Sequence, residues 1–168
     1  MSLKIKYLDG QKSSSKNTAI FLAKDSKFSD FKGNFDDKIN QKIVNFLKNN
    51  KKAKEDKIFS LNLEFDQRLI MILIAKKNDS LQSEKLGAKF YHYIKTNNIN
   101  NVLLLGSNFS TVKSNIKFNE FIHGVELKAY EFNLYKTKKN KKEININILK
   151  NKNLINKNIK NNLDAVLN

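Results

Sequence analysis

The side chains best suited to metal binding or proton transfer in this 168-residue chain are its two histidines, His92 and His123. Neither belongs to a His-x-x-x-His pair, the spacing that places two imidazoles on one face of a helix. The chain contains no cysteine, so thiolate metal sites and disulfides are excluded. We therefore expect both histidines to be packed or surface residues and not metal ligands.

Carboxylates and hydroxyls give no stronger signal for chemistry. The adjacent pairs Asp36-Asp37 and Glu55-Asp56 fall at a predicted helix start and in a lysine-rich loop, where capping and surface charge explain them. Serines 13–15 lack a Gly-x-Ser-x-Gly elbow. Gly106-Ser107 follows a predicted strand without the further residues of a phosphate-binding loop. The sequence thus predicts no catalytic, cofactor-binding or metal-binding residue in this chain.

Lysine is the most conspicuous charged residue. The formal net charge is +16, and Arg68 is the only arginine, although arginine is preferred for bidentate phosphate and base contacts. The excess of Lys, Asn and Ile without Pro, Trp or Cys suggests an AT-rich genome. One cluster could form an anion-binding patch: Lys136, Lys138, Lys139, Lys141 and Lys142. We interpret it as the exit from a helix, with nucleic-acid binding, extended by the lysines of residues 150–160, as the alternative.

The candidate residues described above lie on a chain of alternating strand and helix patterns. Apolar runs and alternation predict strands at residues 4–8, 18–22, 59–65, 69–75, 102–106 and 144–148. Helical periodicity and capping signals predict helices at residues 36–49, 79–96 and around Phe121. A turn at Asp66-Gln67 predicts an antiparallel hairpin between the third and fourth strands. Together these elements predict an α/β fold: a three-layer α/β/α sandwich around a mixed, mostly parallel sheet.

The helix around Phe121 is apolar on two sides. One side, from Phe118 to Phe132, has the width of a sheet-facing surface. His123, Leu127, Tyr130 and Leu134 form a second stripe on roughly the opposite side. This stripe requires either a second helix of the same domain or a body outside this chain. Leu127, Tyr130 and Leu134 are therefore our candidates for an interdomain or protomer contact.

The end of that helix resembles the N-terminal domain of the leucyl aminopeptidase family of metallopeptidases. The resemblance is carried by Ala129, Tyr130, Phe132, Tyr135, Lys136, Thr137, Lys138 and Lys139. Looser agreement at residues 68–74, 85–89 and 101–105 extends it over roughly residues 60–167, whereas the first 55 residues match only in layout. The family's N-terminal domain is similar in fold to macro domains, so we expect a macro-domain-like fold.

The resemblance implies that this chain and the catalytic part of the protein are separate domains. Residues 1–150 would form the N-terminal domain, and residues 151–168, with Ile155, Ile159, Leu163 and Val166 on one face, would begin the helix linking it to a catalytic domain. In the family, peptide hydrolysis depends on two divalent metals (zinc or manganese) in that C-terminal domain. This chain would be inert alone and would contribute to hexamer assembly and access. A macro-like nucleotide or ADP-ribose binder is a further alternative, although the chain has no Gly-Gly pair.

No targeting or membrane-spanning segment is evident. The first ten residues lack the apolar core of a signal peptide. The longest apolar run, residues 69–75, is far shorter than the ~20 residues needed to cross a bilayer. We therefore expect a soluble, cytoplasmic protein without membrane partners.

Overall fold

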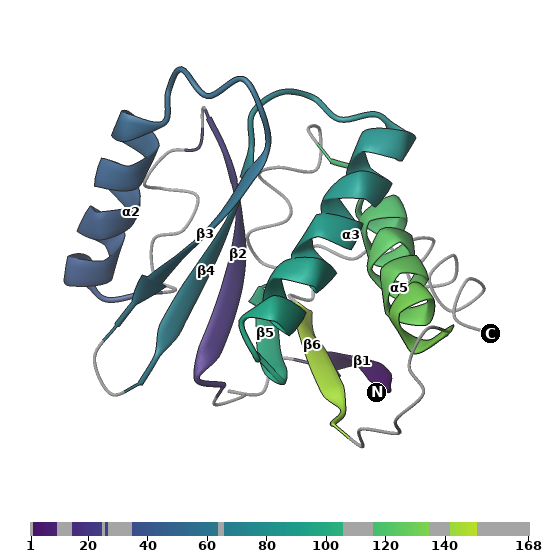
Figure 1. Cartoon of the computed structure of the whole chain (residues 1–168). Helices are drawn as coiled ribbons and strands as arrows, with labels where there is room; N and C mark the ends of the chain where they lie inside the picture. Colours follow the sequence, from purple (N-terminus) through teal and green to yellow (C-terminus); the bar gives the residue numbers. More distant parts are fainter. Residues whose placement is uncertain are drawn as a thin grey trace.

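One six-stranded sheet runs through the centre of the molecule (Figure 1). The computed structural model describes residues 2–9, 15–24, 26, 35–63, 66–105, 116–134 and 142–150. The strands are β1 (Leu3–Asp9), β2 (Asn17–Ala23), β3 (Lys57–Asn62), β4 (Arg68–Ile74), β5 (Asn101–Leu105) and β6 (Ile144–Lys150). Their order is β1-β6-β5-β2-β4-β3, and every neighbouring pair is parallel except β3 with β4. The predicted hairpin and the mixed, mostly parallel sheet are confirmed.

Helices cover both faces of this sheet (Figure 1). Within the described residues, α2 (Asp37–Asn49) packs on one face, while α3 (Ser80–Thr96) and α5 (Phe118–Leu134) pack side by side on the other. Strands β2 and β4 are buried almost throughout because they have neighbours on both edges and helices on both faces. Strand β3 lies at an edge and is only partly buried, in agreement with its alternating sequence. The three-layer α/β/α prediction is confirmed.

The helix ends follow the capping rules that the sequence suggested. The Asp36 side chain accepts a hydrogen bond from the Ile39 N–H at the start of α2. Asp79 and Gln82 form a reciprocal capping box at the start of α3. Just past the other end of α3, Asn98 adopts a positive φ of 55°, a conformation for which helices more often use glycine. Local sequence therefore sets where these helices begin and end.

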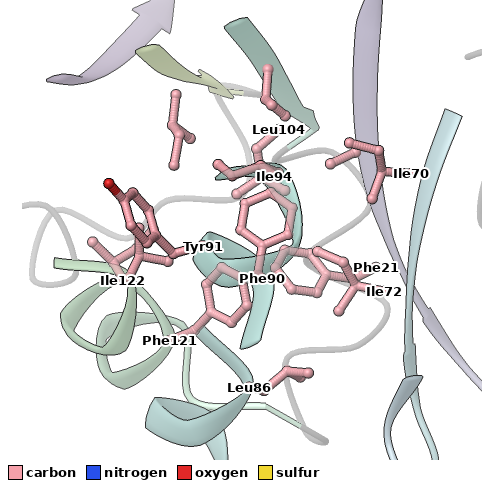
Figure 2. Close-up of a cluster of buried hydrophobic side chains, with 14 of the residues drawn as sticks. Phe21, Ile70, Ile72, Leu86, Phe90, Tyr91, Ile94, Leu104, Phe121 and Ile122 are labelled. Atoms are coloured by element: carbon pink, nitrogen blue, oxygen red, sulfur yellow. The ribbon is translucent and has the colours of Figure 1, made fainter. Parts of the chain in front are cut away.

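The core is divided by the sheet into two layers of apolar side chains. On the α2 side, Ile43 and Leu47 pack against β2 and β4. On the other side, Figure 2 shows the rings of Phe21, Phe90 and Phe121 gathered between the sheet and the two helices. The Phe21 and Phe121 rings meet edge to face with centroids 5.1 Å apart, and Phe90 lies 5.6 Å from Phe121. The larger layer thus anchors α3 and α5 to the sheet as one unit.

Two glycines bring α3 and α5 into close contact. A Cβ atom at Gly87 would lie 1.8 Å from the carbonyl oxygen of Phe121, and one at Gly124 would lie 1.9 Å from that of Glu84. Real Cβ atoms essentially never approach so closely, so each helix backbone rests directly on the other. Because these helices can approach only where a side chain is absent on both, the crossing point is fixed by this pair.

The structure gives Asp56 a more specific structural role than the sequence indicated. Asp56 is not simply a surface charge in a lysine-rich loop, because its carboxylate joins three segments of chain. It accepts hydrogen bonds of 2.8 Å from the backbone N–H of Ala75 and from the amide of buried Asn78. Asp56 therefore ties the start of β3 to the end of β4 and to the residues that precede α3.

Candidate functional site

The most distinctive surface in the described part of the chain lies on α5. Leu127, Tyr130 and Leu134 are 47%, 64% and 60% exposed, although each is large and apolar or aromatic. Their spacing of three and four residues places them in one line along the helix, which we call the α5 stripe. The opposite side of α5, including Phe121, is buried in the core. The structure thus shows that this helix is apolar on two sides, and that one of them faces outward.

His123, at the head of the stripe, contacts the neighbouring helix. Its Nδ1 lies 2.9 Å from Oε2 of Glu84 on α3, within hydrogen-bond distance. Both side chains are more than a third exposed, so this surface interaction adds little to the stability of the α3–α5 pair. Helix α3 is thus a second helix that contacts this side of α5 at His123, while the three residues of the α5 stripe stay exposed.

A groove runs beside the stripe along the seam between the two helices. It has a volume of about 310 Å³, and its lining includes Glu84, Ala88, Gly124, Leu127 and Glu131. Gly124 has no side chain and Ala88 has a small one, so neither fills the space beside Leu127. Lys85 and Lys128 also line the groove, so its charged side chains are of both signs.

Acidic side chains flank the stripe on both sides. At 3.6 residues per turn, Glu126 lies on one flank and Glu131 on the other. Burial raises the pKa of Glu126, and the nearby His123 partly offsets this by lowering it. Glu131 forms an ion pair of 2.6 Å with Lys128. Three Glu and one Lys give α5 a formal charge of −2, in a chain whose net charge is +16.

One residue of the predicted lysine patch, Lys142, belongs to the described part of the chain. Lys136, Lys138, Lys139 and Lys141 lie outside the described residues. Lys142 is described and exposed, two residues before β6 begins. The C-terminal segment of residues 151–168 and the Gly106-Ser107 pair also lie outside the described residues.

A second hollow of about 500 Å³ lies over the outer surface of α3. Its lining includes Ile58, Lys89, His92, Tyr93 and Lys128. The Tyr93 hydroxyl donates to the Ser60 hydroxyl at 2.7 Å and thereby joins α3 to the edge strand β3. The described residues that line this hollow include no acidic side chain.

Polar residues at the carboxyl end of the sheet, where open α/β sheets commonly bind ligands, mostly serve the fold. The Ser83 hydroxyl accepts from the N–H of Lys117 at 3.0 Å and links α3 to the start of α5. The ammonium group of Lys24 donates to the carbonyl of Ala53 at 2.6 Å. Among the described residues no group of three or more His, Asp or Glu side chains could hold a metal ion. The loops after β2 and β5 lie largely outside the described residues.

Sequence reasoning missed the residues that shape the α5 surface. Glu84, Gly124 and Glu126 were not among the candidates, because each becomes informative only when α3 and α5 are side by side. Gly124 did carry a signal, since a glycine in the middle of a helix costs roughly 1 kcal/mol relative to alanine and usually has a packing reason.

Comparison with known proteins shows the fold. No model of a known protein family and no curated protein matches the sequence. Among solved structures, the chain is similar to a mutant of tomato leucine aminopeptidase with a TM-score of 0.58 and 13% identity. That match covers 99% of this chain and 36% of the aminopeptidase. The chain is also similar to the macrodomain of Thermus aquaticus DarG, with a TM-score of 0.59, 8% identity and coverage of 89% of this chain and 100% of that one.

The architecture is therefore macrodomain-like, as the sequence resemblance suggested. Identities of 13% and 8% establish the fold and not the activity. The chain spans little more than a third of the aminopeptidase that it matches, so the activity of that whole enzyme does not transfer with the fold. None of the described helices is both long enough and apolar enough to cross a bilayer.

Proposed function

We propose that this chain is a non-catalytic domain of the type found at the N-terminus of leucyl aminopeptidases, and that it works by contacting other protein surfaces. The observation that carries the proposal is the structural match of nearly the whole chain to about a third of an aminopeptidase. The aromatic and lysine-rich sequence of residues 129–139 supports it. The exposed α5 stripe provides a surface for such contacts.

In the intact protein this domain would pack on a catalytic domain, contribute to a hexamer and limit access to the active site. The two divalent metals, zinc or manganese, would belong to that catalytic domain. The described residues of this chain do not fit a two-metal centre, because they offer no cluster of three candidate ligands. Peptide hydrolysis would accordingly require a part of the protein other than these residues.

An aminopeptidase assay tests this proposal. The purified 168-residue chain is incubated with a leucine anilide in the presence of zinc or manganese, beside an active leucine aminopeptidase as a positive control. We expect release of the anilide leaving group by the control only. Metal-dependent turnover by the chain, retained through further purification, would refute a non-catalytic role.

A second candidate function is favoured by the match to a complete macrodomain. A macro-like nucleotide binder would gain thermal stability in the presence of ADP-ribose, because a ligand that binds only the folded state raises the unfolding temperature. The contact-domain proposal predicts a flat titration. A saturable rise in the unfolding temperature would replace it with the nucleotide-binding function.

A further inference from the structure

The two edges of the central sheet differ in how well they are protected against pairing with another strand. Strand β3 forms one edge and, among the described strands, pairs with β4 alone (Figure 1). The opposite edge strand, β1, carries Lys4 and Lys6, and charged side chains of this kind discourage pairing with another chain. From Ile58 to Asn62, β3 has neither a charged residue nor a proline. The edge of β3 is therefore the one suited to accepting a further strand.

The hairpin with β4 determines which backbone groups of β3 point to the open edge. The Leu63 N–H donates to the Gln67 carbonyl at 2.7 Å, and the register of the two strands is continuous. Antiparallel strands alternate between residues bonded to the partner and residues facing away from it, so the odd-numbered residues of β3 bond β4. The N–H and C=O groups of Ile58, Ser60 and Asn62 consequently point to the open edge.

The hollow over the outer surface of α3 borders this edge. Ile58 lines it, and so does Tyr93, whose hydroxyl donates to the Ser60 hydroxyl. The other described lining residues include Lys89 and Lys128 and no acidic residue. Lys128 is paired with a glutamate of its own helix, whereas the exposed Lys89 forms no ion pair within the described residues. A ligand at the edge would therefore meet an uncompensated positive charge on the α3 side.

The charges of α3 and β3 point the same way. Three lysines and Glu84 give α3 a formal charge of +2 (3 minus 1). The Glu84 carboxylate lies 2.9 Å from His123 and thus faces α5, on the other side of α3 from β3. Strand β3 itself contributes Lys57 and no acid. Electrostatic complementarity at this face of the edge favours acidic side chains in a partner.

The other face of the edge is apolar. Phe59 and Leu61 point to the α2 side of the sheet and are only partly buried. The Phe59 ring meets that of Phe46 on α2 edge to face, with centroids 4.8 Å apart. Successive side chains of a strand point to opposite faces, so a strand added here would place alternate residues beside these rings and beside α3. Apolar side chains suit the α2 side.

We infer that β3 accepts an extended peptide segment as a seventh strand of the six-stranded sheet, and that acidic and apolar residues alternate in this segment. In such strand addition the backbone hydrogen bonds supply affinity, and the alternate side chains supply specificity. A second copy of this chain is a poorer occupant, because its β3 and α3 would bring like charges together. The inference gives the contact function a defined partner but rests on the β3 edge alone, so the aminopeptidase assay and the experiments below can fail independently.

Amide hydrogen exchange in the full chain, measured by NMR, tests the inference. The probe is a capped peptide of alternating glutamate and valine, and the control is a capped peptide of the same composition with the two residue types in separate blocks. We expect the alternating peptide to slow exchange at Ile58, Ser60 and Asn62. Exchange at Phe59 and Leu61, which already bond β4, should change little. The block peptide should leave all five residues unchanged.

Three results of this experiment would overturn the inference. Unchanged exchange at the edge-facing residues would show that no strand is added there. Equal slowing by both peptides would reduce the effect to attraction between an acidic peptide and a chain of net charge +16. Protection of the same residues without peptide, in a protein of dimeric mass, would assign the edge to a second copy of the chain.

Two pairs of variants measure the same site through the affinity of the labelled alternating peptide, by fluorescence anisotropy. Ser60→Pro removes an N–H that faces the open edge, whereas Ser60→Ala removes only the hydroxyl. Lys89→Glu reverses a charge at the hollow, whereas Lys85→Glu makes the same change on α3 beside the groove next to Leu127. We expect Kd to rise about fivefold or more for Ser60→Pro and Lys89→Glu and to stay near the wild-type value for the two controls.

Equal effects within either pair would contradict the inference. Because Lys89 is exposed, its pair remains informative if Ser60→Pro fails to fold.

Discussion

Gly87 and Gly124 are the residues on which the arrangement of α3 and α5 depends most directly. Each lacks the atom that would collide with a backbone carbonyl of the other helix, at 1.8 Å and 1.9 Å. Backbone atoms cannot move aside as a flexible side chain can. Because the groove next to Leu127 borders Gly124, the same contact also shapes the candidate functional surface.

Replacement of Gly124 by alanine should therefore destabilise the protein. Helix propensity alone favours alanine by about 1 kcal/mol. We expect the clash to outweigh this gain and to lower the free energy of unfolding by about 1–3 kcal/mol, the usual range for overpacking. Urea denaturation of Gly124→Ala measures the change, and Lys85→Ala on the exposed side of α3 serves as a control that stays within about 0.5 kcal/mol. Stabilisation by Gly124→Ala would contradict the observed approach of the helices.

The raised pKa of Glu126 predicts a pH-dependent effect of a single substitution. A carboxyl whose pKa is higher in the folded than in the unfolded state favours folding at low pH, and this contribution is lost as the pH rises through the folded-state value. Glu126→Gln, which cannot ionise, should raise the urea midpoint at pH 7 and have a smaller effect at pH 4. Glu131→Gln, which only removes an exposed ion pair with Lys128, should show no such gain. A change for Glu126→Gln that is the same at both pH values would exclude burial of the ionised form as its cause.

At the scale of secondary-structure elements, Asp56 links two strands and the entry to a helix. Its two carboxylate oxygens hold the N–H of Ala75 and the side-chain amide of Asn78 at the junction of β3, β4 and the entry to α3. Asn78 is only 3% exposed, so water cannot readily replace a lost partner.

Asp56→Ala should accordingly cost about 1–3 kcal/mol in the free energy of unfolding, the penalty for leaving buried polar groups without partners. Its neighbour provides a matched control, because Glu55 is exposed and Glu55→Ala removes the same charge from the same loop. We expect Glu55→Ala to change stability by less than about 0.5 kcal/mol. Equal effects of the two substitutions would mean that charge, and not the hydrogen bonds, determines the result.

The elements themselves could be predicted because their signals are local. Alternating isoleucines at 144, 146 and 148, the apolar run at 69–75 and the Asp79–Gln82 capping box depend only on neighbours in sequence, and the structure confirms the corresponding strands and helix. The role of Asp56 and the helix crossing at Gly124 could not be predicted, since their partners are 19 to 40 residues away in sequence (75 minus 56, and 124 minus 84). The stripe was predicted as a pattern, but its exposure depends on how α3 packs against α5.

At the scale of the whole molecule, charge is distributed unevenly. The net charge of +16 arises outside α5, which carries −2. A protein of this composition can attract nucleic acid through its lysines without any specific site. The acidic flanks of the α5 stripe make that surface an unfavourable place for a phosphate backbone.

Any association with nucleic acid should therefore be sensitive to salt and indifferent to sequence. Fluorescence anisotropy with two duplexes of unrelated sequence measures both properties. We expect any affinity seen at ~50 mM salt to fall by orders of magnitude by ~200 mM and to be similar for the two duplexes, as counterion release predicts. Binding that persists at the higher salt concentration, or that favours one duplex, would support a dedicated nucleic-acid function instead.

We propose that the chain works through protein contact and not through a bound metal or nucleotide. Native mass spectrometry of the purified chain, titrated in turn with zinc, manganese and ADP-ribose, tests it most directly because each bound species adds a defined mass. We predict the mass of the bare chain, 19.5 kDa, with only concentration-dependent, non-stoichiometric adducts. A saturating one-to-one or two-to-one adduct of metal or ADP-ribose would contradict the claim.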